Sequence, residues 1–98
     1  MKQAIPWLAM VSLFAAHGAH ADQAAADLCA KTLQPYARLV FDSVTARPQP
    51  EFTLRAVLEA RVRELVFTDR LMRSAARPAA ENASECLRIA RNCTAENC

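Results

Sequence analysis

The most regular hydrophobic pattern in the chain runs from Thr53 to Met72, a stretch without Gly or Pro. At about 100° per residue, apolar side chains gather on one broad face and charged side chains on the opposite one. The apolar face holds Leu54, Val57, Leu58, Val62, Leu65, Val66 and Met72, and the charged face holds Arg55, Glu59, Arg63 and Arg70. A second, weaker apolar strip holds Ala56, Ala60, Phe67 and Leu71. A helix with two apolar faces lies between neighbours, so the pattern predicts the central helix of a small bundle.

Prolines divide the rest of the chain into further helices. Pro35 and Pro78 are each expected to begin a helix, because proline is tolerated at the first helical position but not in the interior. The segment Arg47-Pro48-Gln49-Pro50 favours extended backbone and separates the second helix from the third. We expect four helices, near residues 24–33, 35–46, 51–72 and 78–91, in a compact all-α bundle. A single kinked helix in place of the first two is the alternative.

The N-terminal residues have the pattern of a secretory signal peptide. Met1-Lys2-Gln3 is a short positive start, residues 5–16 are almost wholly apolar, and Ala19-His20-Ala21 matches a signal peptidase site. The apolar run is shorter than the roughly 20 residues of a membrane span. We therefore predict cleavage after Ala21, a periplasmic protein without a stable membrane anchor, and one small domain over residues 22–98. An N-terminal core helix or an uncleaved anchor is the alternative.

Removal of the leader changes the available chemistry. His17, His20, Gly18 and Trp7 are lost with it, so residues 22–98 contain no His, Gly or Trp. Without Lys2, 11 basic residues face 10 acidic ones, and a net charge of +1 does not indicate a nucleic-acid partner. A nucleophile would lack its usual His base, and no spacing recommends Lys31 as a substitute. We expect a non-enzymatic protein with no catalytic residue and no cofactor.

All four cysteines lie after the predicted cleavage site, at positions 29, 86, 93 and 98. An even number of cysteines in a short exported chain predicts disulfides, and four allow three pairings. The spacing of Cys93 and Cys98 is neither that of a zinc knuckle nor that of a thiol oxidoreductase, so we predict no metal site.

Several short motifs resemble a loose set of small exported helical proteins of Gram-negative bacteria. The matching residues are Cys29, Pro35-Tyr36-Ala37, Phe41-Asp42, and the run from Ala76 to Glu81 that leads to Glu85-Cys86-Leu87. The resemblance implies an all-helical periplasmic protein in which Cys29 is joined to Cys86, and it implies no activity. Cys93 and Cys98 depart from that pattern.

The positions of the cysteines in the predicted elements favour the same pairing. Cys29 and Cys86 fall on apolar helix faces, whereas Cys93 and Cys98 lie together in the tail, residues 91–98. We therefore expect one disulfide between the first and last helices and a second one that closes the tail.

Two charged residues, Arg61 and Asp69, fall within the apolar sector of the predicted central helix. A buried unpaired charge costs several kcal/mol, so each side chain must reach water or a partner. In one account Arg61 lies at the rim of the bundle and Asp69 pairs with Arg73 or Arg77. In the other, Arg61 is the polar anchor of a ligand or partner groove.

The second apolar strip is the candidate binding surface. An exposed Phe67–Leu71 pair beside Arg63 and Arg70 has the composition of a modest protein-binding patch, and the alternative is that the tail covers it. The candidate partner-binding residues are Arg61, Arg63, Phe67, Arg70 and Leu71.

Two functional classes follow. The first is a protein-interaction module, for example an inhibitor or an immunity protein against a toxin, whose partner is another protein or a second copy of the chain. The alternative is a periplasmic protein that binds a small molecule or metal in the bundle interior. Small Ala-rich faces favour the first class, because tight Ala packing leaves little internal volume.

Overall fold

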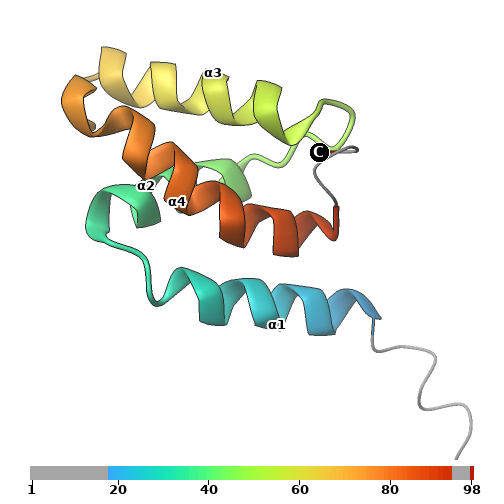
Figure 1. The fold of residues 1–98 in the computed structure, drawn as a ribbon. Coiled ribbons are helices and arrows are strands. Elements are labelled where there is room, and N and C mark those ends of the chain that lie inside the picture. Colours follow the sequence, from blue (N-terminus) through green and yellow to red (C-terminus); the bar gives the residue numbers. More distant parts are fainter. Residues whose placement is uncertain (1–17, 94–97) are drawn as a thin grey trace, which may run out of the picture.

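A computed structural model describes residues 18–93 and residue 98, and the chain forms four helices there. They are α1 (Gly18–Ala30), α2 (Pro35–Ala46), α3 (Leu54–Phe67) and α4 (Arg73–Arg91). Helix α4 lies between α1 and α3, and α2 packs against both α3 and α4 (Figure 1). The predicted all-α four-helix bundle is confirmed, but its central helix is α4 and not the 53–72 stretch. Helix α4 is the longest helix, and its small buried Ala79 and Ala83 allow neighbouring helices to approach closely.

The first two helices meet at a short turn before Pro35. Helix α1 ends at Ala30, three residues earlier than expected, and the residues up to Leu33 form turns. Helix α2 covers the predicted 35–46 range, with Pro35 in its first turn after an extended Gln34. The two prolines at 48 and 50 then keep the connector, residues 47–53, out of helical structure.

Helix α3 is shorter than its apolar pattern predicts. It begins at Leu54, after the Thr53 side chain accepts a hydrogen bond of 3.1 Å from the Ala56 amide. It ends at Phe67 because Asp69 adopts a left-handed conformation, with φ of 62°. The Arg70 amide then donates to the Leu65 carbonyl and the Asp69 amide to the Val66 carbonyl. This pair of bonds is the Schellman motif that terminates helices, and it corrects the predicted end at residue 72.

Helix α4 begins earlier than the proline rule predicts. Arg73 is its first residue, so the predicted start at Pro78 is wrong and Pro78 lies inside the helix, in its second turn. Pro78 has no amide hydrogen to donate to the Ser74 carbonyl, which costs one helical bond. Its side chain is exposed, so the ring displaces nothing in the core. At the other end Asn92, with φ of 53°, closes a second Schellman motif.

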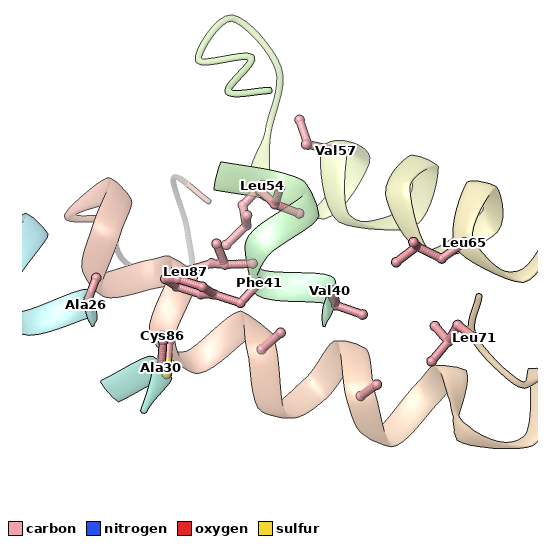
Figure 2. Close-up of a cluster of buried hydrophobic side chains, with 13 residues drawn as sticks. Ala26, Ala30, Val40, Phe41, Leu54, Val57, Leu65, Leu71, Cys86 and Leu87 are labelled. Atoms are coloured by element: carbon pink, nitrogen blue, oxygen red, sulfur yellow. The ribbon is translucent and has the colours of Figure 1, made fainter. Parts of the chain in front are cut away.

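The core is one cluster of small and medium apolar side chains from all four helices and from the α3–α4 turn (Figure 2). Its members are Ala26, Ala30, Val40, Phe41, Val44, Leu54, Val57, Leu65, Leu71, Ala79, Ala83, Cys86 and Leu87.

Both expected disulfides are present. Cys29–Cys86 joins α1 to α4 with a Cα–Cα distance of 5.5 Å, and Cys93–Cys98 closes the tail with the same distance. The first bridge spans 57 positions of sequence and fixes the outer helix α1 to the centre of the bundle.

The predicted leader lies largely outside the described residues, which begin at Gly18 within α1. Cleavage after Ala21 would remove only the first turn of α1 and would leave its buried Ala26 and Ala30 in place. Within the part of the chain that the structure describes, no helix has both the length and the hydropathy of a membrane span.

Candidate interaction surface

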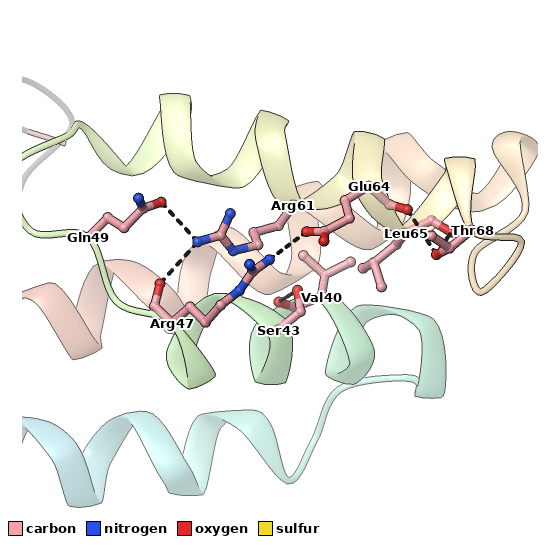
Figure 3. Close-up of polar contacts among 8 residues, drawn as sticks. All are labelled: Val40, Ser43, Arg47, Gln49, Arg61, Glu64, Leu65 and Thr68. Atoms are coloured by element: carbon pink, nitrogen blue, oxygen red, sulfur yellow. Dashed lines mark hydrogen bonds and ion pairs between the residues drawn. The ribbon is translucent and has the colours of Figure 1, made fainter.

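Arg61 is a buried part of the fold. Its side chain is 7% exposed and lies on the buried face of α3 with Leu54, Val57 and Leu65. One terminal nitrogen, Nη2, donates to the Arg47 carbonyl at 3.2 Å and to Gln49 Oε1 at 2.8 Å (Figure 3). A buried guanidinium needs such partners, and the connector supplies two acceptors to Nη2, whereas the buried Nε has no hydrogen-bond partner among the described residues. Arg61 therefore does not lie at an exposed rim, as one account expected, and it does not line the α3–α4 groove; its role in partner binding stays a prediction.

Two more arginines hold the connector in place. Arg91, at the end of α4, donates to the Phe52 carbonyl at 2.7 Å and to the Gln49 carbonyl at 3.1 Å. Arg47 forms an ion pair of 2.6 Å with Glu64 on α3 (Figure 3). Because α3 and α4 both bind the same connector, the start of α3 is fixed beside the end of α4.

Cys98, the last residue of the tail, also lies at the start of α3. The Cys98 carbonyl accepts a hydrogen bond of 2.6 Å from the Leu54 amide, one of the amides that a helix start leaves unpaired. Residue 98 is thus at the beginning of α3, at the opposite end of that helix from Phe67. Residues 94–97 lie outside the described part of the chain.

The two apolar residues of the predicted patch have different environments. Phe67 is 88% exposed, whereas Leu71 is 3% exposed and belongs to the core. The reason is the turn at Asp69, after which the Leu71 amide bonds back to the Leu65 carbonyl at 3.1 Å. Asp69 itself is exposed in that turn and forms no ion pair with another described residue. The exposed part of the predicted patch is therefore Phe67 with Arg63 and Arg70.

Sequence reasoning missed an open groove of about 930 Å³ between α3 and α4. Its apolar lining comes from residues that are half-buried, chiefly Leu58 and Val62 on α3 and Ala76 and Ala80 on α4. Its charged lining comprises Arg55, Glu59, Arg63, Arg77, Glu81 and Arg88. Four arginines against two glutamates leave two positive charges in excess. The sequence did contain one signal for the groove, which is the pair Ala76 and Ala80 with Arg77 between them. Because the last helix was expected to begin at Pro78, Ala76 fell outside that helix and the pair was not recognised.

The arginines separate into two groups. The sequence has ten, since two of its 12 basic residues are Lys2 and Lys31. Four hydrogen-bond to described residues, namely Arg38, Arg47, Arg61 and Arg91. Six form no side-chain hydrogen bond or ion pair with a described residue, namely Arg55, Arg63, Arg70, Arg73, Arg77 and Arg88. The first group contacts other parts of the fold, whereas four members of the second line the groove, Arg70 lies in the α3–α4 turn and Arg73 begins α4.

Groups that could carry catalysis or hold a metal are sparse on the described residues. All four cysteines are in disulfides, and no group of three or more His, Cys, Asp or Glu side chains in residues 18–93 and 98 is placed to hold a metal ion. Lys31 is exposed just after α1. Ser43 and Ser84 donate to main-chain carbonyls of their own helices.

Comparisons with protein-family models, with curated proteins and with solved structures find no match to this chain. The resemblance to small exported helical proteins therefore stays a prediction that rests on the short motifs quoted for it.

Proposed function

We propose that this protein is a non-enzymatic periplasmic interaction module that binds another protein through its α3–α4 face. We define this face as the groove between the two helices together with Phe67. The observation that carries the proposal is a groove with apolar side chains on its floor and four arginines without a described partner in its lining, at one edge of which an exposed Phe follows.

The composition of the α3–α4 face is that of a binding surface. Phe67 is one helical turn beyond Arg63, the residue at the outer edge of the groove on α3, so the helical repeat places its ring next to that edge and outside the groove itself. Aromatic and arginine side chains are enriched at protein interfaces and among the residues that contribute most binding energy. Burial of a largely exposed Phe side chain against a partner would add a favourable hydrophobic contribution.

A small-molecule ligand is the second candidate. The groove volume lies within the range of about 300–1,000 Å³ that is common for ligand sites. The groove is, however, open and lies on the surface, whereas ligand sites enclose most of the ligand. These features favour a protein partner, and an inhibitor or immunity protein would be one form of such a module.

The proposal is tested by affinity capture from periplasmic extract with two matched variants. Phe67→Ser alters the α3–α4 face, and Leu28→Ser alters an apolar residue on α1 that is 64% exposed. We expect one protein to co-purify with the unmodified chain and with Leu28→Ser, and to be lost with Phe67→Ser. A bound small molecule in place of a protein, or equal capture by both variants, would contradict the proposal.

A further inference from the structure

We propose that the α3–α4 groove binds an acidic amphipathic helix of the partner protein. This inference rests on the proposed function and adds the chemistry of the partner. It follows from the shape of the groove, from its apolar floor and from the positions of its arginines.

The groove has the length of about three helical turns. Its lining extends from Leu54 to Arg63 on α3 and from Ala76 to Arg88 on α4. At 1.5 Å per residue these stretches are about 14 Å and 18 Å long. A third helix laid between two packed helices contacts both of them, and its apolar side chains enter the space between. The groove therefore fits a short helical segment and is too long for a single side chain.

The side chains on the floor of the groove are small enough for a partner helix to approach closely. Ala76 and Ala80 are four residues apart on α4, so their methyl groups lie one above the other on the same face. Leu58 and Val62 have the same spacing on α3 and are half-buried, which leaves part of each side chain available. An apolar stripe on the partner would cover these four side chains and remove them from water.

The charged walls select an acidic helix. Arg55 and Arg63 are eight residues apart on one wall, about 12 Å, and Arg77 and Arg88 are eleven apart on the other, about 16 Å. Asp or Glu residues about two to three turns apart on each flank of the partner helix would meet these guanidinium groups. Bonds between guanidinium and carboxylate are charge-assisted and can be bidentate, which adds specificity.

The two acidic residues of the groove argue against a polyanion. Glu59 and Glu81 lie among the arginines and would repel a continuous row of phosphates, whereas carboxylates spaced along a helix can avoid them. The predicted mature chain has a net charge of only +1, which is too small for non-specific attraction to nucleic acid. The apolar floor also has no counterpart on a sugar–phosphate chain.

Stapled helical peptides of about 14 residues test the inference directly. One peptide carries a Leu stripe flanked by Glu, and a second carries the same stripe flanked by Lys. With the oxidised protein, fluorescence anisotropy should show at least about tenfold tighter binding of the Glu peptide, and added salt should weaken it. Equal binding of the two peptides, or equally effective competition by a single-stranded oligonucleotide, would overturn the inference.

Charge reversals locate the binding. Arg55→Glu with Arg63→Glu should weaken binding of the Glu peptide about tenfold or more, because two attractions become repulsions. The matched control, Lys31→Glu with Arg73→Glu, changes the net charge equally at exposed sites outside the groove lining and should have little effect. Equal losses in the two double variants would overturn the groove as the site. Circular dichroism checks that both remain folded.

The peptide and capture results separate the two proposals. A natural partner whose capture needs Phe67 but not Arg55 and Arg63 would leave the proposed function standing and end this inference. Selective peptide binding without any captured protein would support the chemistry of the groove and contradict the proposed function.

Discussion

Phe67 and Leu71 lie four residues apart and look alike in the sequence, but their replacement by Ala should have very different effects on stability. Phe67 is 88% exposed at the end of α3, and Leu71 is 3% exposed within the core. Leu71 lies in the turn after Asp69 and packs against residues of α3 and α4.

The expected magnitudes follow from these exposures. Truncation of a buried Leu to Ala costs about 2–5 kcal/mol, from lost apolar burial and from the cavity left behind. If Leu71→Ala lowers the free energy of unfolding by about 3 kcal/mol, the melting temperature of a domain of this size should fall by roughly 12–24 °C. Phe67→Ala leaves no cavity, because most of the ring is already in water, and should change the free energy of unfolding by no more than about 0.5 kcal/mol.

Urea and thermal unfolding of the oxidised protein, followed by circular dichroism, measures both changes. Leu71→Ala should lower the urea midpoint strongly while Phe67→Ala leaves it near that of the unmodified protein. A large loss from Phe67→Ala would show that another part of the chain covers the ring, and it would remove Phe67 from the α3–α4 face. A negligible loss from Leu71→Ala would refute the assignment of Leu71 to the core.

Three further predictions concern the disulfides, the buried arginine and export. Loop entropy assigns about 4 kcal/mol to the bridge that spans 57 positions and about 2 kcal/mol to the one that spans 5, so Cys29→Ser should lower the urea midpoint more than Cys98→Ser. An equal decrease of the urea midpoint in the two variants would contradict that order. Arg61→Met should cost about 1–3 kcal/mol, because the Arg47 carbonyl and the Gln49 side chain lose their donor, and the exposed control Arg55→Met should change the midpoint little. Intact mass from a periplasmic fraction should correspond to a chain that begins at Asp22, and a full-length membrane-bound species would refute export with cleavage.

The sequence was sufficient for features that local chemistry determines. Pro35 sets the start of α2 because its ring is compatible with the first helical turn, and the two prolines of the connector keep α2 from continuing. The disulfide pairing was also predictable, since Cys29 and Cys86 lie on apolar faces of helices that must pack together.

Other features depend on contacts that no local pattern reveals. Helix α3 ends at a Schellman motif whose left-handed residue is Asp69, where glycine is the usual signal. Helix α4 continues through Pro78, because packing elsewhere along the helix outweighs one missing hydrogen bond. Arg61 is buried because a connector more than ten residues away supplies its acceptors.

The prediction of the binding surface depended on where α3 ends and where α4 begins. With α3 extended to residue 72, Phe67 and Leu71 fall on one exposed strip, and with α4 delayed to residue 78, Ala76 falls outside a helix. The observed ends place Leu71 in the core and bring Ala76 into the lining of the same groove as Leu58 and Val62. The exposure of Phe67 and the positions of Arg63 and Arg70 on the surface were within reach of the sequence, and the groove was not.

The most direct test of the proposed function is photo-cross-linking within the cells that make the protein. A photoreactive phenylalanine analogue at position 67 or 58 probes the α3–α4 face, and the same analogue at position 28 probes α1 on the other side of α4. We predict that one second protein is cross-linked from positions 67 and 58 and not from position 28. Absence of a protein cross-link at both positions, or the same product from position 28, would contradict the proposal that this protein is an interaction module that uses its α3–α4 face.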